Sequence, residues 1–322
     1  MRVLVFGAGA IGSVLGGLLA QAGHDVTLLG RPWHLDAIAR QGLRVEGLWG
    51  AHHLRPEPSA LTLATAPEHI TRLLPTAPFD WIFVCVKASQ TAQAAETLTP
   101  WLRPGTLVCA FQNGLGNYEA LTARVPAPRV ALARVIFGAE VAEPGRVRVT
   151  VCADEVLLGA PDPAVPRERI IALASALQEA GVPARATTTI LTAIWGKVLY
   201  NCALNGLSTL LEVPYGRLLE REAAKRLMRR IIEEAYRIAQ AQGLRLEPSN
   251  AAAYAELLFT RLIPDTAAHH PSMLQDLRRG RATEIESLNG ALVRLAQALD
   301  LDAPANELVT RLVQMKERLV LP

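Results

Sequence analysis

Apolar and polar positions change their period near the middle of the chain, which predicts two regions of different fold. In the first half, short apolar runs of strand length alternate with stretches of helical period. After Thr189 the strand-like runs stop and helical periods dominate. This order predicts an α/β region, residues 1–187, followed by an all-α region, residues 188–322.

The apolar runs of the first half predict a sheet that is mainly parallel. Continuous apolar runs are typical of parallel strands that helices cover on both faces. The predicted strands are Val3–Phe6, His24–Leu29, Trp81–Val86 and Thr106–Phe111, with a last strand near 182–186. Between about residues 55 and 80, several prolines favour irregular connections, to which we assign no function.

Alternating runs between about residues 129 and 159 predict antiparallel hairpins that extend this sheet. The runs are 130–141, 147–151 and 156–158, and Glu143-Pro144-Gly145-Arg146 interrupts them. Helical periods with Gly and Pro at their ends predict helices over about 167–179, 189–210, 217–242, 249–262, 284–299 and 305–318.

Composition narrows the class of protein. The 322 residues are 50% hydrophobic and 20% charged, which is typical of a globular chain with room for two domains. The formal charge is only +3 and no basic tract forms, so nucleic-acid binding is not favoured. No apolar run approaches the ~20 residues of a membrane span. Because Met1-Arg2 leads directly into a strand, we expect a cytoplasmic protein without a membrane partner.

The four cysteines predict neither a metal site nor a disulfide framework. They are far apart, without a Cys-x-x-Cys pair, and each lies in an apolar setting: Cys85, Cys109, Cys152 and Cys202. This use of cysteine is typical of small core residues in a reducing compartment.

A glycine turn directly after the first strand predicts a dinucleotide site. In Gly7-Ala8-Gly9-Ala10-Ile11-Gly12, the first glycine allows the tight turn, the second allows close approach of a pyrophosphate, and the third allows helix–strand packing. The phosphates would meet the N–H groups at the helix start. We therefore expect Gly7, Gly9, Ala10, Ile11 and Gly12 to bind the cofactor. The α/β region, residues 1–187, is thus predicted to be a Rossmann-type dinucleotide-binding region.

The end of the second strand predicts which cofactor binds. NAD-binding units usually carry Asp or Glu there for the ribose 2′-hydroxyl, whereas this strand ends in Gly30-Arg31. An arginine suits a 2′-phosphate, because its guanidinium binds phosphate through two hydrogen bonds. The alternative is a solvated loop arginine. Because the acidic residue is missing, we predict NADP(H).

Two further polar residues follow the third and fourth predicted strands. Lys87 and Asn113 lie where ligands bind in open α/β sheets, outside the carboxyl ends of the strands. Asn113-Gly114 is equally well explained as a turn signal.

Lys197, Asn201 and Asn205 form a polar stripe on an otherwise apolar predicted helix. Residues four apart share one helix face, and buried polar groups are costly unless they find partners. Lysine is also rare here, with four lysines against 29 arginines. An amine can transfer a proton near neutral pH, which a guanidinium cannot do. A lone lysine would favour a side chain reaching for solvent, but two asparagines in register favour a site.

Ser272 and Glu284 lie in one further polar segment. Ser272 and Asp276 are one helical step apart, Gly280 ends that helix, and Glu284 is expected in the first turn of the next. The helix dipole alone would favour a glutamate there. The same position would also direct a carboxylate toward a ligand.

Together these segments resemble the ketopantoate reductases, NADPH-dependent enzymes of pantothenate and coenzyme A synthesis. The resemblance spans the chain and depends on several motifs together, because Rossmann proteins in general share only the first. The motifs are the glycine turn, Arg31, Val86-Lys87-Ala88, Gln112-Asn113-Gly114, Trp195-Gly196-Lys197 through Asn205, Ser272-Met273-Leu274-Gln275-Asp276 and Thr283-Glu284-Ile285.

The resemblance implies reduction of a 2-keto acid, 2-dehydropantoate, with Lys197 as the general acid–base and Glu284 as the carboxylate that holds the substrate hydroxyl. It further implies that Asn113, Asn201, Asn205 and Ser272 position the substrate and nicotinamide. Lys87 would help to hold the cofactor or the substrate, and Arg31 would bind the 2′-phosphate of the cofactor. The substrate site is expected in a cleft beside the nucleotide region.

One departure leaves the keto acid open: the family often has Asn where this chain has His269. Two alternatives also remain. One is a related NADP-dependent reductase of another 2-keto acid, of the opine or hydroxyacid type. The other is a non-catalytic NADPH-binding sensor, which would not need Lys197 or Glu284. The sequence leaves the oligomeric state open, a homodimer included.

Overall fold

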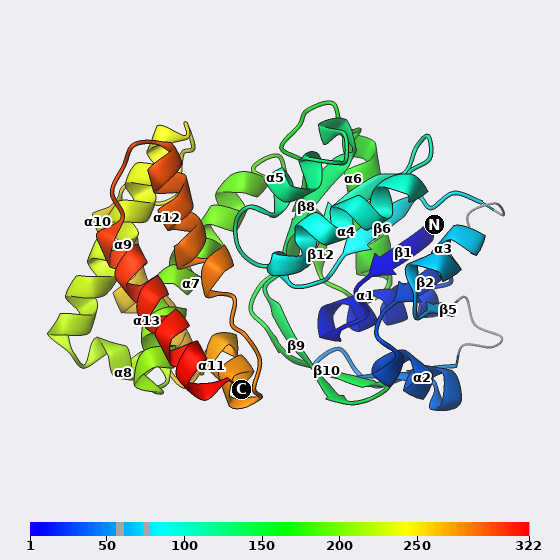
Figure 1. The fold of residues 1–322 in the computed structure, drawn as a ribbon, viewed down its shortest axis with the longest axis horizontal. Coiled ribbons are helices and arrows are strands. Elements are labelled where there is room, and N and C mark those ends of the chain that lie inside the picture. Colours follow the sequence, from blue (N-terminus) through cyan, green and yellow to red (C-terminus); the bar gives the residue numbers. More distant parts are fainter. Residues whose placement is uncertain (56–60, 74–76, 322) are drawn as a thin grey trace. The chain divides into compact units, whose positions relative to one another are not determined.

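The computed structural model describes residues 1–55, 61–73 and 77–321. Two compact units form: unit 1 is Met1–Asn113 with Asn117–Ile190, and unit 2 is Gly114–Gly116 with Leu191–Pro322. Unit 1 is an α/β fold, drawn from blue to green in Figure 1, and unit 2 is helical, drawn from green to red. The predicted fold class, a Rossmann-type region followed by an all-α region, is confirmed.

The main sheet of unit 1 has eight strands in the order β12-β11-β8-β7-β6-β1-β2-β5. All neighbours pair in parallel except β8 and β11, which are antiparallel. The strands are β1 (Arg2–Phe6), β2 (Asp25–Leu29), β5 (Leu61–Ala64), β6 (Trp81–Val84), β7 (Leu107–Ala110), β8 (Val130–Arg134), β11 (Val156–Gly159) and β12 (Ala184–Ala186). The predicted parallel strands are confirmed, with β6 and β7 shorter than expected.

Helices cover this sheet because side chains on both faces of its strands are apolar. Val3, Leu4 and Val5 are all fully buried although they alternate between the two faces of β1. Helix α1 packs with α6, and α4 with α5. The helices of unit 1 are α1 (Ala10–Gln21), α2 (Pro32–Gln41), α3 (Pro67–Leu73), α4 (Thr91–Leu98), α5 (Asn117–Thr122) and α6 (Arg167–Glu179).

A second, four-stranded sheet corrects one prediction. The hairpin of β9 (Phe137–Glu143) and β10 (Arg146–Cys152) does not extend the main sheet, because β10 pairs with β3 (Leu43–Gly47). Strand β4 (His52–Leu54) completes this sheet on the other side of β3. Its position follows from Gly17 of α1, where an added Cβ would lie 2.9 Å from Leu43 and 3.1 Å from Val45. The missing side chain allows α1 to be buried against both sheets.

The region from 55 to 80, predicted to be irregular, contains two regular elements. Strand β5 pairs in parallel with β2, and α3 follows it. Pro67 opens α3, where a missing N–H costs nothing, so this proline marks a helix start instead of a break. Residues 56–60 and 74–76 lie outside the described residues.

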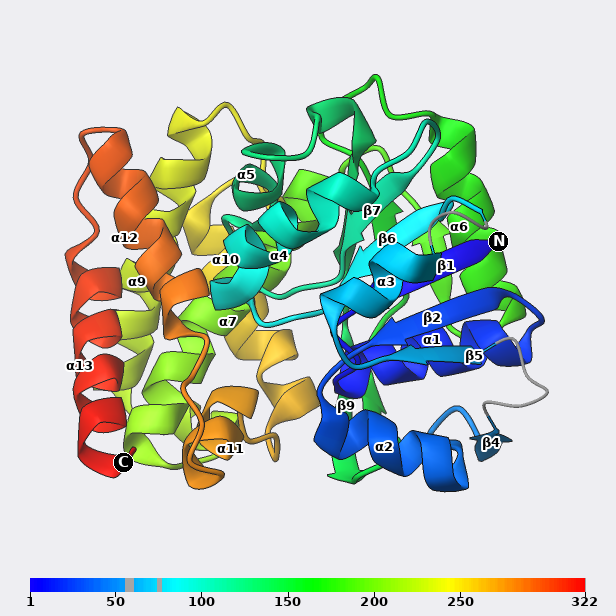
Figure 2. The same cartoon turned by 45° about the vertical axis from the view of Figure 1, so that its right-hand side comes forward.

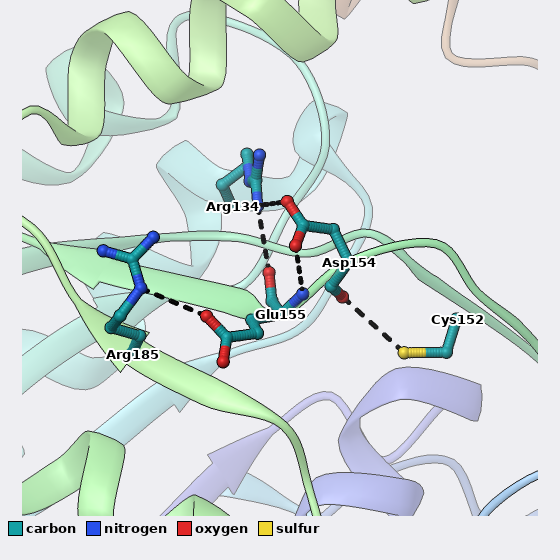
Figure 3. A network of polar contacts seen from close by, with 5 residues as sticks. All are labelled: Arg134, Cys152, Asp154, Glu155 and Arg185. Carbon is teal, nitrogen blue, oxygen red and sulfur yellow. Dashed lines mark hydrogen bonds and ion pairs between the residues drawn. The ribbon is translucent and has the colours of Figure 1, made fainter. Parts of the chain in front are cut away.

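A polar network holds the loop that returns from the second sheet to the main sheet (Figure 3). The Arg134 guanidinium at the end of β8 donates to Asp154 at 2.6 Å and to the Glu155 carbonyl at 3.0 Å. Arg185 of β12 pairs with the Glu155 carboxylate at 3.1 Å. Desolvation raises the pKa of Asp154, but its hydrogen bonds to Arg134 and to the Glu155 N–H outweigh this and lower the pKa. These contacts fix the start of β11 beside β8.

Unit 2 is built around α7 (Ile190–Leu211), whose Val198, Leu199, Cys202 and Ala203 side chains are buried. The other helices are α8 (Tyr215–Leu219), α9 (Glu222–Ala241), α10 (Ala251–Leu257), α11 (Ser272–Arg278), α12 (Asn289–Ala298) and α13 (Pro304–Val320), with short π and 3₁₀ segments at Leu258–Leu262, Pro264–Thr266 and Ile285–Ser287. Figure 2 shows α9, α12 and α13 side by side, in agreement with their contacts.

The helix predicted from residue 284 begins later. Glu284 precedes a 3₁₀ turn, and α12 starts only at Asn289. The reason is that the Ser287 carbonyl accepts a hydrogen bond from the Leu115 N–H at 2.9 Å, and Leu288 has non-helical backbone angles (φ −109°, ψ −105°). Within residues 1–55, 61–73 and 77–321, every helix is too short or too polar to span a lipid bilayer.

Candidate functional site

The glycine turn closes tightly between β1 and α1. Gly7 has φ +110°, and the N–H groups of Gly7 and Ala8 both donate to the Leu29 carbonyl at the end of β2, each at 2.9 Å. A Cβ on Gly12 would lie 2.3 Å from the Gly7 carbonyl oxygen, so a side chain there would force the turn open. The turn is therefore held in one shape by β1, β2 and α1 together.

The space above this turn suits an anionic group. Gly9 is exposed, and a Cβ added to it would meet nothing within 4 Å. Gly9 precedes α1 and gives no side-chain cap, and no acidic residue lies in the first turn. The N–H groups at the helix start are thus left for an outside acceptor, and the helix dipole favours a negative charge there. Ala10 and Ile11 begin the helix and are half-buried. These residues fit a dinucleotide pyrophosphate.

Arg31 follows β2 on the same edge of the sheet. It lies immediately before α2, is exposed, and forms no ion pair with any residue whose position is described. A Cβ on Gly30 would lie 2.8 Å from the Ala8 Cβ, so only glycine fits between Arg31 and the turn. Asp25 starts β2 at its other end and pairs with Arg2 at 3.2 Å.

His34, which the sequence analysis missed, anchors α2 beside this turn. It is 1% exposed; the Gly145 N–H donates to its Nδ1 and its Nε2 contacts the Ser13 hydroxyl, each at 3.1 Å. Since Nδ1 accepts, Nε2 carries the proton and donates to Ser13. Burial lowers the pKa of His34. The neutral imidazole thus links α2 to α1 and to the β9–β10 turn.

Lys87 and Asn113 lie after the neighbouring strands β6 and β7, and both are half-buried. A hydrogen-bond chain joins their segments. The Gln112 amide donates to the Val86 carbonyl at 2.9 Å and to the Thr91 hydroxyl at 2.7 Å. The Asn117 amide donates to the Asn113 carbonyl at 3.0 Å. The glycine turn, Arg31, Lys87 and Asn113 therefore share the carboxyl edge of four adjacent strands, β7-β6-β1-β2, as predicted for a nucleotide site.

The predicted polar stripe is present on α7. Lys197 and Asn201 are half-buried and Asn205 is 5% exposed. Neighbouring positions of the helix, such as Trp195 and Val198, are buried. One face of α7 therefore presents an amine and two amides, while the others pack into the core of unit 2.

Tyr215, a second residue that the sequence analysis missed, fixes the orientation of Asn205. Its hydroxyl donates to Asn205 Oδ1 at 2.6 Å in a buried setting, and burial raises the pKa of Tyr215. Asn205 Nδ2 donates to no residue of the described chain. Because Oδ1 is occupied, the amide presents its two N–H donors to any ligand.

His269 packs against the same tyrosine. Its ring centroid lies 5.3 Å from that of Tyr215, and its carbonyl accepts from the Tyr215 N–H at 3.1 Å. Although its side chain keeps an exposed edge, desolvation and then the neighbouring His270 lower the pKa of His269. Ser272, three residues later, is the exposed first residue of α11. Asp276 is instead structural, since it pairs with Arg281 at 2.9 Å.

Glu284 is half-buried just before the 3₁₀ turn of residues 285–287. The Ser287 hydroxyl donates to the Glu284 carbonyl at 3.0 Å and so fixes its backbone. The Leu115 N–H donates to the Ser287 carbonyl, and Leu115 lies two residues after Asn113. This hydrogen bond, within unit 2, fixes the backbone of the 3₁₀ turn that follows Glu284. A nearby hydrogen bond from Asn289 to the Cys202 carbonyl, 3.1 Å, joins this segment to α7.

The arrangement defines a class of protein: an oxidoreductase with a Rossmann-type dinucleotide-binding region and a helical region that carries a lysine–asparagine stripe. The chain belongs to the ketopantoate reductase family. Residues 3–163 match the family described as Ketopantoate reductase PanE/ApbA, and residues 189–317 match its C-terminal counterpart.

Relatives of known name and structure agree with this assignment. The chain is 37% identical to a 2-dehydropantoate 2-reductase of Aquifex aeolicus, over 98% of this chain and 97% of the relative. It is similar to the crystal structure of a PanE/ApbA family ketopantoate reductase from Ralstonia eutropha, with TM-score 0.85, 33% identity and 99% of each chain covered. It is also similar to a ternary structure of D-mandelate dehydrogenase with NADH and anilino(oxo)acetate, with TM-score 0.84, 26% identity and 99% of each chain covered.

Proposed function

We propose that this chain catalyses the NADPH-dependent reduction of 2-dehydropantoate to pantoate, a step of pantothenate and coenzyme A biosynthesis. Family membership supports the reaction and substrate class. The observation that carries the proposal is the stripe on α7, in which a half-buried amine, Lys197, is aligned with Asn201 and Asn205 on an otherwise apolar helix. Residues 188–322 would supply the catalytic and substrate groups, and residues 1–187 would bind NADP(H).

The cofactor-binding roles belong to the edge of the main sheet. Gly7, Gly9, Ala10, Ile11 and Gly12 would hold the pyrophosphate, because the turn leaves open space above Gly9 and the first N–H groups of α1 have no acceptor within the helix. Arg31 would bind the 2′-phosphate, which its lack of an ion pair within the described chain supports. Lys87 and Asn113 would hold the nicotinamide half.

The proton-transfer role belongs to Lys197. NADPH, when bound, supplies the hydride that reduces the ketone carbon. Negative charge develops on the ketone oxygen, and Lys197 would stabilise that charge and then donate a proton to the oxygen. Asn201 and Asn205 would orient the 2-keto acid through their N–H donors, and Ser272 would hydrogen-bond its carboxylate or hydroxyl.

Substrate recognition would depend on Glu284. Its carboxylate would accept a hydrogen bond from the hydroxyl of 2-dehydropantoate, which unsubstituted 2-keto acids do not carry. A site built to accept such a bond discriminates strongly against analogues that lack the hydroxyl, because its own polar group is then left unpaired.

The test is NADPH oxidation with 2-dehydropantoate, followed by absorbance at saturating cofactor. Lys197→Ala should lower kcat by about 10²–10⁴-fold while NADPH binding is retained, because the loss concerns proton transfer and charge stabilisation. Lys225→Ala, which removes a lysine paired with Glu222 on α9, is the matched control and should leave kcat unchanged. Near-normal turnover of Lys197→Ala would refute the catalytic role.

A second candidate is reduction of another 2-keto acid, with NADH as an alternative cofactor. The similarity to D-mandelate dehydrogenase with NADH supports it, as does His269 beside Tyr215. Steady-state rates with 2-dehydropantoate, benzoylformate and pyruvate, each with NADPH and NADH, separate the candidates. A kcat/KM that is highest for an aromatic keto acid would favour this second candidate. Tight NADPH binding without oxidation by any of them would favour a sensor.

A further inference from the structure

Helix α13 carries an apolar stripe on its solvent side. Half of the large hydrophobic side chains that are exposed in the described part of the chain lie on this helix: Leu308 (51%), Leu312 (39%), Met315 (56%), Leu319 (79%) and Val320 (51%). Contiguous exposed apolar surface on a soluble protein usually marks an interaction site, whereas single exposed side chains are ordinary.

The spacing of this stripe is that of a helix–helix seam. Leu308, Leu312, Met315 and Leu319 follow one another at intervals of four, three and four residues, so they fall within about 60° of the helix circumference. Alternation of three and four is the pattern that packs one helix against another in coiled coils. The opposite side of α13 is already used, because Val309 and Val313 are fully buried in unit 2.

We propose that this stripe, defined as Leu308, Leu312, Met315 and Leu319, is a self-association surface that packs antiparallel against the same stripe of a second copy of this chain. A two-fold axis through the middle of the stripe would place Leu308 opposite the partner's Leu319 and Leu312 opposite the partner's Met315. Such an isologous contact closes on itself, which is the commonest form of homo-oligomer.

Charge selects the antiparallel arrangement. Glu307 and Arg318 lie on the same flank of the stripe, eleven residues or about 16 Å apart. Arg318 has no ion pair with any described residue, and Glu307 pairs only with Arg311. In an antiparallel pair, each Glu307 comes opposite the partner's Arg318. In a parallel two-fold pair this flank would instead face the partner's other flank, so the pairing of Glu307 with the partner's Arg318 would not form.

The other flank of the stripe makes contacts within unit 2, so its charged group does not pair with the partner. The Lys316 ammonium donates to the Thr209 carbonyl at 2.9 Å and to Glu212 at 2.8 Å. At the start of α13, Leu308 borders a groove of about 850 Å³ that Leu227, Arg230 and Pro304 also line. In the antiparallel pair the partner's Leu319, the most exposed of the four, would arrive at this groove. The apolar end of one helix would thus meet a recess beside the other.

Analytical ultracentrifugation of the full chain tests this proposal. A contact built mainly from one helix pair is small, so we expect a reversible dimer within about 1–100 μM. Met315→Glu should shift the dissociation constant upward by at least about 10-fold, since a buried unpaired charge is costly. Ile171→Glu on α6, which alters another exposed apolar side chain, is the control and should leave association unchanged.

A charge exchange tests the orientation. Glu307→Arg and Arg318→Glu should each weaken self-association, and an equimolar mixture of the two variants should associate again as a heterodimer. A wild-type chain that stays monomeric over the whole range, or a dimer that Met315→Glu leaves intact, overturns the proposal. A mixture that associates no better than either variant overturns the antiparallel pairing.

Discussion

Asn205 acquires its direction from a residue ten positions later in the chain. The Tyr215 hydroxyl donates to Asn205 Oδ1, and no other described side chain holds that amide. If Asn205 binds the substrate as proposed, Tyr215 is a positioning residue. It would ensure that the amide offers N–H donors to the substrate and keeps its oxygen turned away.

We therefore expect Tyr215→Phe to raise the KM for the keto acid about 5–10-fold, because a net hydrogen bond contributes about 1 kcal/mol. The change in kcat should be smaller, and the KM for NADPH should not change. Tyr236→Phe is a matched control. Its hydroxyl donates to the Pro248 carbonyl at 2.7 Å and makes no hydrogen bond with Asn205 among the described residues. Equal KM values for both variants would contradict the positioning role.

Site residues could be predicted from the sequence only where their chemical type and their local spacing both pointed to one site. The lysine–asparagine stripe was predictable because residues four apart lie on one face of a helix. The rarity of lysine in this chain also drew attention to Lys197. Tyr215 was not, because α7 ends at Leu211 and the turn into α8 sets which residue returns to Asn205. The roles of Lys197, Glu284 and the other site residues stay predictions.

At the scale of the element, glycine is needed at two positions of the glycine turn, Gly9 and Gly12, for different physical reasons. Gly9 faces open space, whereas a Cβ on Gly12 would lie 2.3 Å from the Gly7 carbonyl. Gly9→Ala should therefore lower the free energy of unfolding by less than about 1 kcal/mol, as an ordinary surface change does. It should nevertheless raise the KM for NADPH, because the new methyl group meets the pyrophosphate.

Gly12→Ala is the informative partner of that variant. Backbone has to move to relieve its clash, so the free energy of unfolding should fall by about 1–3 kcal/mol. Thermal unfolding without cofactor and NADPH titration by fluorescence measure the two effects separately. The same loss of stability in both variants would mean that Gly9 has a structural role and that the open space above it is not a ligand site.

Helix α2 depends on a neutral His34, which predicts a pH effect. The pKa of His34 is lowered by burial, so the unfolded chain binds a proton at this position at higher pH than the folded chain does. The stability that it contributes is present above the unfolded value of about 6.5 and is lost as pH falls toward the lowered folded value. A protonated ring also loses the acceptor at Nδ1 for the Gly145 N–H.

We expect the free energy of unfolding to fall more steeply below about pH 6.5 for the wild type than for His34→Gln. The two proteins differ in that only the wild type has a titratable ring at position 34. His34→Gln should be less stable at neutral pH, since its amide does not reproduce both hydrogen bonds. Denaturant unfolding between neutral and mildly acidic pH measures both curves. Parallel curves would show that His34 does not set this dependence.

Elements were predictable where period and length agree. Continuous apolar strands such as β1 and long helices such as α7 were predicted correctly, because the apolar positions of each segment fit only one kind of element. The β9–β10 hairpin was assigned to the wrong sheet, because its pairing partner β3 lies about a hundred residues earlier in the chain. Gly17 allows the second sheet to approach α1, but a glycine in a helix does not identify that partner. The start of α12 was misplaced, because the Leu115 N–H occupies the Ser287 carbonyl.

At the scale of the whole molecule, each unit has its own core, and the proposed cofactor residues belong to unit 1 alone. A ligand that binds only the folded chain stabilises it by RT ln(1 + [L]/Kd), about 2.7 kcal/mol at 100 times Kd. Saturating NADPH should therefore raise the temperature of the first unfolding transition by several degrees. NADH at the same concentration should raise it less, because only NADPH carries the 2′-phosphate that Arg31 would bind.

Arg31→Ala separates the contribution of the 2′-phosphate contact from the general affinity for the cofactor. The variant should reduce the shift given by NADPH to about that given by NADH, while the shift given by NADH stays as in the wild type. Arg40→Ala, an exposed arginine in the last turn of the same helix α2, should leave both shifts unchanged. Differential scanning calorimetry with each nucleotide measures all of these shifts. If Arg31→Ala lowers both shifts equally, the arginine acts on the fold of α2 or on the shared pyrophosphate. Discrimination between the two cofactors would then belong to other residues.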